Sequence, residues 1–222
     1  MQPRMKSKLI VALDVPTYPE AERLVRELSG VVDTFKVGYQ LFTRVGPRIV
    51  EFLRAQGRDC FLDLKFHDIP HTVAKGVESA AALEVRMLTV HTAGGDEMLR
   101  AAAGVAPRPL LLGVTVLTSV DGDVAGEVAR RAALAQDCGL DGVIASASEA
   151  AAIRTARGPA FLIVTPGIRP AGAAVADQKR VVPPAAAIRA GADYIVVGRP
   201  IVAAANPAQA AAAIVAELGA AG

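Results

Sequence analysis

The sequence is poor in several features that would assign it to a common class. It has no tryptophan, and aromatic residues make up only 4% of its 222 residues. Its two cysteines, Cys60 and Cys138, lie far apart and form no CxxC motif. We therefore interpret them as two buried thiols rather than as a redox or metal-binding motif.

Long apolar runs and an excess of one charge are also missing. No apolar stretch reaches membrane-spanning length without charges or glycines. Residues 1–8 are basic but are not followed by the apolar core and small-residue cleavage site of a signal peptide. The formal net charge is only +2 and no Lys/Arg-rich run occurs. We expect a cytoplasmic protein that binds neither membrane nor nucleic acid.

What the sequence does contain is a regular alternation of two kinds of segment. Short apolar runs predict eight strands, at residues 9–13, 34–37, 60–64, 87–90, 110–115, 142–145, 161–165 and 194–197. Between them, segments with helical spacing or strong helix formers predict helices at residues 19–28, 48–56, 125–136, 148–157 and 207–218. This order predicts parallel βαβ units.

Such units build either a closed barrel or a doubly wound open sheet. Polar residues end nearly every predicted strand, and in a barrel these ends converge on one mouth, whereas in an open sheet they spread along an edge. The residues in question are Asp14, Lys36, Asp63, Lys65, His91, Thr118 and Arg199. We therefore predict an α/β fold, a single (β/α)8 TIM-barrel domain over residues 1–222.

The densest group of polar residues is the segment DLKFHDIP at 63–70. Asp63 and Lys65 are two apart on a strand, so their side chains share the face that lines the barrel interior. Proteins rarely bury two charges without pairing or a function. Asp68 lies past the strand end, and Pro70 begins a helix. The alternative to a catalytic pair is a salt bridge that closes the end of the barrel.

Further polar residues end other strands. Taken alone, Lys36 could be a lysine at the barrel rim that reaches solvent, and Asp14 could cap the next helix. Together with Asp63 and Lys65, these two residues predict a charged cluster. After the last strand, Gly198 and Arg199 precede a helix, where backbone N–H groups and a guanidinium bind phosphate in many barrels. A plain strand-to-helix turn is the alternative there.

These motifs resemble, in order, those of the orotidine 5′-phosphate decarboxylases. The matching strings are LDV (13–15), FKVG (35–38), DLKFHDIPHT (63–72), TVLTS (115–119), TPGIRP (165–170), DQKR (177–180) and VVGRPI (196–201). One departure is His71, where Asn is more usual. The resemblance implies decarboxylation of orotidine 5′-phosphate to UMP, the last step of de novo pyrimidine nucleotide synthesis, by a homodimer without cofactor or metal.

The resemblance also implies a role for each matching residue. The catalytic residues would be Lys65 as proton donor, with Asp63, Lys36 and, from the other subunit, Asp68. Asp14, Lys36 and the neighbour's Thr72 would contact the ribose, and Thr118 the pyrimidine. Phosphate would bind to Arg169, Gly198 and Arg199, and Gln178 would reach phosphate and base from a lid at residues 166–184, a long irregular stretch.

Elementary chemistry agrees with these roles, but two other functions share the pattern. Loss of CO2 from C6 leaves a carbanion with no adjacent carbonyl, which a fixed cation such as Lys65 stabilises and protonates. A metal-dependent keto-sugar-phosphate decarboxylase or synthase shares DxKxxD, and a catalytically silent phosphate-binding barrel shares the phosphate site. A metal held by His67, His71 or His91 with Asp68 is disfavoured, because a loop-to-helix junction separates the first two.

Overall fold

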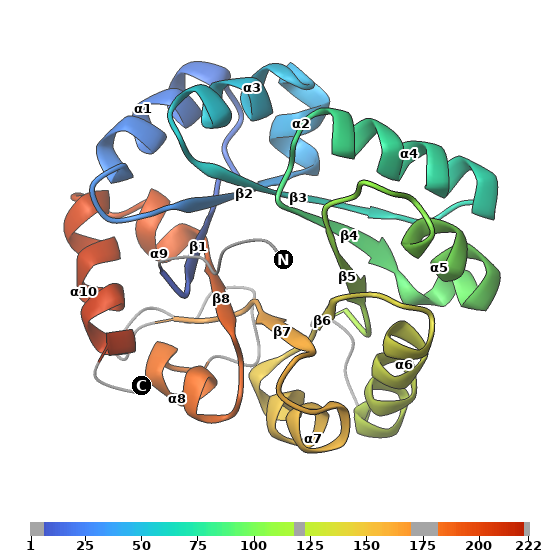
Figure 1. Ribbon diagram of the computed structural model, residues 1–222. Helices are drawn as coiled ribbons and strands as arrows, with labels where there is room; N and C mark the ends of the chain where they lie inside the picture. Colours follow the sequence, from blue (N-terminus) through green and yellow to red (C-terminus); the bar gives the residue numbers. More distant parts are fainter. Residues whose placement is uncertain (1–6, 118–122, 170–181, 220–222) are drawn as a thin grey trace.

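The eight strands of the computed structural model close into a parallel barrel, with the helices outside it (Figure 1). The structure describes residues 7–117, 123–169 and 182–219. The strands are β1 Leu9–Ala12, β2 Thr34–Gly38, β3 Asp59–Phe66, β4 Met87–His91, β5 Leu110–Val114, β6 Gly142–Ile144, β7 Leu162–Thr165 and β8 Tyr194–Val197. Because β8 pairs with β1, the predicted barrel is confirmed and the open sheet was the wrong alternative.

Helices follow the strands, and five of those in the described ranges lie where the sequence predicted them. The helices are α1 Tyr18–Leu28, α2 Tyr39–Val45, α3 Arg48–Ala55, α4 Pro70–Ala82, α5 Gly95–Ala103, α6 Ala125–Asp137, α7 Ala147–Arg157, α8 Pro184–Arg189, α9 Arg199–Val202 and α10 Pro207–Gly219, with a 3-10 turn η1 at Thr92–Gly94. None of the helices in the described ranges has the length and hydrophobicity that a membrane crossing needs.

Two apolar layers hold the barrel together. Inside it, side chains such as Phe61, Met87 and Leu112 form one cluster, and outside it the other faces of the strands pack against the helices. The alternation along β3 illustrates this, because Phe61 lies in the inner cluster and Leu62 in the outer one. Charged side chains, among them Lys36 and Asp63, line a pocket above the inner cluster, toward the carboxyl ends of the strands.

The amino-terminal end of the barrel is closed by ion pairs between neighbouring segments. An aspartate just before or at the start of a strand pairs with an arginine in four places: Asp33–Arg58, Asp59–Arg86, Asp141–Arg108 and Asp193–Arg154. Asp193 Oδ2 lies 2.5 Å from Arg154 Nη2 and also accepts a hydrogen bond from the Ile163 amide at 2.8 Å. This end of a TIM barrel serves stability rather than chemistry.

The structure corrects one local alternative from the sequence. The cap of α1 is Thr17, whose hydroxyl accepts a long, 3.4 Å hydrogen bond from the Glu20 amide. Asp14 does not cap this helix, because its carboxylate pairs with Lys36 instead. Asp14 therefore belongs to the charged cluster at the mouth of the barrel.

Candidate active site

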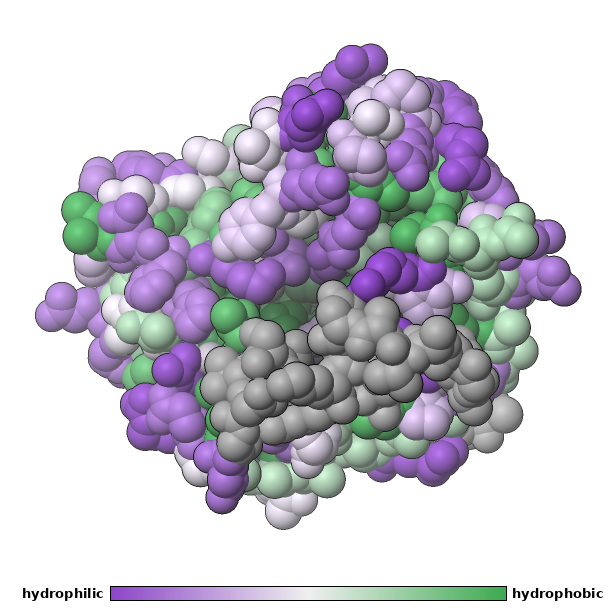
Figure 2. Space-filling model, turned by 180° about the vertical axis from the view of Figure 1, so that it is seen from behind, coloured by the Kyte–Doolittle hydropathy of each residue, from purple (hydrophilic) through white to green (hydrophobic). Residues whose placement is uncertain are grey.

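A pocket of about 470 Å³ lies at the carboxyl ends of the strands, where the sequence predicted a functional site. Most of the predicted site residues line it: Asp14, Lys36, Asp63, Lys65, Arg169, Gly198 and Arg199. The face opposite to that in Figure 1 is hollowed near its centre, with hydrophobic surface in the hollow and hydrophilic residues beside it (Figure 2). Thr118 and Gln178 lie outside the described residues.

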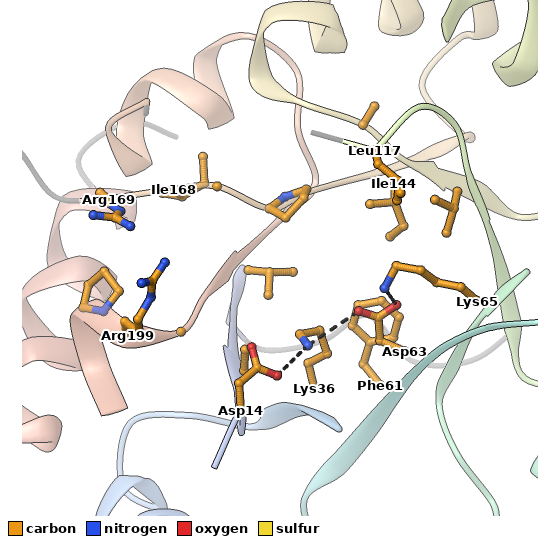
Figure 3. A pocket seen from close by; sticks show the side chains of 18 of the residues that line it. Asp14, Lys36, Phe61, Asp63, Lys65, Leu117, Ile144, Ile168, Arg169 and Arg199 are labelled. Carbon is orange, nitrogen blue, oxygen red and sulfur yellow. Dashed lines mark hydrogen bonds and ion pairs between the residues drawn. The ribbon is translucent and has the colours of Figure 1, made fainter. Parts of the chain in front are cut away.

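Four of these side chains form a chain of alternating charge. Lys36 Nζ lies 3.1 Å from Asp14 Oδ1 and 3.5 Å from Asp63 Oδ2. Lys65 Nζ donates a hydrogen bond to Asp63 Oδ1 at 2.8 Å. The row of contacts therefore leads from Asp14 through Lys36 and Asp63 to Lys65 (Figure 3). Lys36 is only 12% exposed, which excludes a lysine that reaches out into solvent.

Asp63 is the centre of this array and is held in its charged form. Burial by itself raises the pKa of the carboxyl. The charges of Lys36 and Lys65, with hydrogen bonds from Lys65 and Thr89, outweigh burial and hold the pKa of Asp63 below its usual range. The pocket therefore presents a fixed carboxylate and two cations at one end.

Two arginines mark the other end of the pocket. Figure 3 shows Arg169 and Arg199 near each other, across the pocket from the Asp63–Lys65 pair. Arg169 follows β7 and is 5% exposed, and Arg199 begins α9 directly after Gly198. Guanidinium groups suit a phosphate through paired hydrogen bonds. The space between the two ends is lined by apolar side chains, among them Phe61, Val116 and Ile168.

Residues 7–214 match the family model described as "Orotidine 5'-phosphate decarboxylase / HUMPS family". The chain belongs to this family. It is 49% identical to the orotidine 5'-phosphate decarboxylase of Moorella thermoacetica, over 96% of this chain and 92% of that protein. The corresponding enzyme of Halorhodospira halophila is 52% identical, over 97% of each chain.

Solved structures of similar chains have the same fold. The crystal structure of orotidine 5'-phosphate decarboxylase from Lactobacillus acidophilus is 37% identical and aligns with a TM-score of 0.84, over 96% of this chain and 99% of that chain. An uncharacterized conserved protein from Geobacillus kaustophilus is 39% identical, with a TM-score of 0.81 over 95% and 99% of the two chains. The family and the barrel expected from the motifs are thus confirmed.

Two predicted site residues lie beside the pocket rather than in it. Asp68 and Thr72 line a neighbouring depression of about 730 Å³. Asp68 Oδ1 accepts a hydrogen bond from the Ile69 amide at 2.6 Å, and in the described part of the chain Asp68 makes no ion pair with Lys65. Lys65 lines both hollows, so the Asp63–Lys65 pair stands at their boundary.

Two of the three histidines, His67 and His91, pack against each other. The rings of His67 and His91 stack with their centroids 5.4 Å apart, and His91 Nδ1 accepts a hydrogen bond from the Ala93 amide at 3.2 Å. Burial and the neighbouring His67, Arg131 and Lys65 lower the pKa of His91. Within the described ranges, no group of three or more His, Cys, Asp or Glu side chains is arranged to hold a metal.

The sequence reasoning missed two polar residues that contact the charged array. Thr89 is fully buried in β4, two residues after the inward-facing Met87, and its hydroxyl donates to Asp63 Oδ1 at 3.0 Å. Tyr39 is the first residue of α2, and the centroid of its ring lies 5.4 Å from Lys65 Nζ. The period of two along β4 was the available signal for Thr89; nothing in the sequence pointed to Tyr39.

Proposed function

We propose that this chain decarboxylates orotidine 5′-phosphate to UMP, the last step of de novo pyrimidine nucleotide synthesis, as one TIM-barrel domain. The observation that carries the proposal is the Asp63–Lys65 pair facing two arginines across a pocket. Membership of the family and the names of its relatives support the same substrate.

In this proposal Lys65 is the proton donor. The bond between C6 and the carboxylate carbon breaks, CO2 leaves, and the electron pair remains on C6. The Lys65 ammonium stabilises that charge and gives C6 its proton, after which Lys65 regains a proton from solvent. Asp63 pairs with the ammonium at 2.8 Å and fixes its place, and Lys36 and Asp14 extend the array toward the ribose hydroxyls.

The arginines supply binding energy far from the reacting carbon. Arg169 and Arg199, with the backbone at Gly198, would hold the phosphate. Because this contact is remote, its energy can position the pyrimidine without opposing the chemistry. We assign base contacts to Thr118, and base and phosphate contacts to Gln178, from their place in the family motifs.

The second subunit of a homodimer completes the site in this proposal. Asp68 and Thr72 belong to the depression next to Lys65, and Ile69 between them is 65% exposed, as is expected of a loop that reaches a neighbour. Asp68 of one subunit would enter the pocket of the other and give the Lys65 ammonium a second carboxylate. Thr72 would accompany it and contact the ribose.

The test is formation of UMP from orotidine 5′-phosphate by the purified protein, with and without EDTA. We expect full turnover in both conditions, because the proposed chemistry needs only side chains. Loss of turnover on EDTA treatment, restored by a divalent cation, would show that a metal takes part and would overturn the mechanism in which side chains alone act. Absence of UMP in either condition would overturn the assignment.

A further inference from the structure

The peptide bond between Leu64 and Lys65 lies in an irregular part of the barrel. In the pairing of β3 with β4, Leu62 faces Leu88 and Phe66 faces Val90, so three residues of β3 lie opposite the single residue Thr89. Lys65 itself has φ of +45°, a region that side-chain-bearing residues rarely adopt. The regular ladder therefore does not fix the backbone that carries the proposed proton donor.

Two side-chain hydroxyls hold this peptide bond from different elements. The Lys65 amide donates to Thr89 Oγ1 at 2.8 Å, and the Tyr39 hydroxyl donates to the Leu64 carbonyl at 2.9 Å. The carbonyl of Leu64 and the N–H of Lys65 belong to one planar peptide unit. Bonds at both of its polar groups fix the orientation of that plane, and with it the direction in which the Lys65 side chain leaves the backbone.

The same two residues also contact the ion pair. Thr89 accepts from the Lys65 amide and donates to Asp63 Oδ1, the oxygen that also accepts from Lys65 Nζ. Tyr39 bonds the backbone with its hydroxyl and lies beside the Lys65 ammonium with its ring. Each residue thus connects the bulged backbone to the charged atoms that it must place.

We propose that Thr89 and Tyr39 are positioning residues, which clamp the Leu64–Lys65 peptide and so set where the Lys65 ammonium meets C6. This inference rests on the proposed decarboxylation. It separates two functions within the site: the arginine end decides how tightly the nucleotide binds, and the clamp decides how well the bound nucleotide reacts.

The first test is Thr89→Val, which removes both hydrogen bonds at nearly constant volume. We expect kcat to fall about tenfold to a hundredfold, the effect of losing hydrogen bonds to a charged group, while KM changes less than about threefold. Thr89→Ser keeps the hydroxyl, and we expect it to retain kcat within about threefold of wild type. The pH profile of kcat/KM adds a readout. Loss of the hydrogen bond from Thr89 raises the pKa of Asp63, so the fall of kcat/KM on the acid side should begin at higher pH.

The second test is Tyr39→Phe, which removes the bond to Leu64 but keeps the ring. We expect a smaller loss of kcat, about threefold to tenfold. Because both hydroxyls hold one peptide, the double variant should lose less than the product of the two single losses. Thr34→Val is the matched control: this threonine is also fully buried, and its hydroxyl has no hydrogen-bond partner in the described part of the chain.

The outcomes are distinct. A wild-type protein that makes no UMP overturns the proposed function and this inference with it. An active wild type with Thr89→Val at unchanged kcat, or with Thr34→Val as damaging as Thr89→Val, overturns the clamp alone. Should Thr89→Val fail to fold, Thr89→Ser and Tyr39→Phe decide: loss of kcat in Tyr39→Phe with kcat retained in Thr89→Ser supports the clamp, and any other pattern overturns it.

Discussion

The Lys65 ammonium nitrogen lies 2.8 Å from Oδ1 of Asp63, with the two side chains 25% and 14% exposed. Solvent therefore screens this pair only in part, and removing one member leaves the other partly buried without its main partner. The charge and hydrogen bond of Lys65 help to hold the pKa of Asp63 below its usual range. A substitution at either position is expected to disturb both.

Lys65→Ala should abolish turnover and spare binding. We expect kcat to fall at least about a thousandfold, because the proton donor is lost, while UMP still binds through the arginine end. Single-turnover assays and calorimetric titration with UMP measure the two effects. Lys75→Ala is the control, since Lys75 lies on the outside of α4 and pairs with Glu78. Turnover of Lys65→Ala within tenfold of wild type contradicts the role.

Lys36→Met should move the acid limb of kcat/KM to higher pH. The pKa of Asp63 is held below its usual value despite burial, so its carboxylate persists as pH falls and is lost only below the ordinary range. The stability that this ionisation contributes is present above the pKa of an unfolded aspartate and disappears as pH falls through the lowered one. Removing the Lys36 charge raises that pKa.

The control for this profile is Arg23→Met, which breaks an exposed pair with Glu27 on α1. Its acid limb should coincide with that of wild type. An unshifted limb in Lys36→Met would show that Lys36 does not set the ionisation of Asp63.

Arg169→Ala and Arg199→Ala should discriminate between ligands with and without phosphate. We expect UMP to bind about tenfold to a hundredfold more weakly to each variant, and uridine to change less than about threefold, because only the charged hydrogen bonds are lost. Titration calorimetry gives both constants. Equal losses of affinity for UMP and uridine would refute the phosphate assignment. The control is the surface variant Arg130→Ala, which should change the affinity for neither ligand.

Mixing two inactive variants tests the shared site. If Asp68 acts in the neighbouring subunit, a dimer of Lys65→Ala with Asp68→Ala has one doubly damaged site and one intact site. Random exchange of equal amounts should restore roughly a quarter of wild-type activity, since half of the dimers are mixed. Lys65→Ala mixed with Asp63→Asn is the control: both residues serve their own barrel, so no intact site forms. If subunits exchange and no activity returns in the first mixture, Asp68 acts within its own chain.

The Asp193–Arg154 ion pair at the amino-terminal end of the barrel should affect stability and not activity. Asp193→Asn removes the charge that pairs with Arg154 and weakens the hydrogen bond accepted from the Ile163 amide. Because both interactions are partly buried, we expect the free energy of unfolding to fall by about 2 kcal/mol. Glu27→Gln, in an exposed helical pair, should cost less than about 0.5 kcal/mol. Urea unfolding measures both, and kcat of the folded variants should match wild type.

Much of this molecule could be predicted from its sequence, and the failures have physical causes. All eight strands were predicted, because parallel strands buried on both faces are continuous apolar runs. Five helices of the described residues, α2, α4, α5, α8 and α9, were not among the predicted ranges, although Pro70 was expected to begin a helix and Arg199 to precede one. The reasons are local, since α2 contains aromatic and β-branched residues, α5 begins with glycine, and α8 and α9 are short.

The charged cluster was predicted for a reason that was only partly right. Asp63 and Lys65 do line one pocket, but inside a bulge with a positive φ at Lys65, so simple alternation along a strand does not account for their contact. The bonds from Thr89 and Tyr39 to the peptide depend on how β3 is registered against β4 and where α2 begins. Such relations between distant segments have no local sequence pattern.

The bulge in β3 has a consequence for protein engineering. Copying the DLKFHD segment into another eight-stranded barrel would transfer the charges but not the two hydroxyls that hold the Leu64–Lys65 peptide. A host strand would then relax toward regular pairing and turn the lysine away. The smallest part of this site that can be transplanted is therefore three elements, β3, β4 and the start of α2. A graft that omits Thr89 or Tyr39 would contain every charged residue of the DLKFHD segment, and we expect it to have low activity.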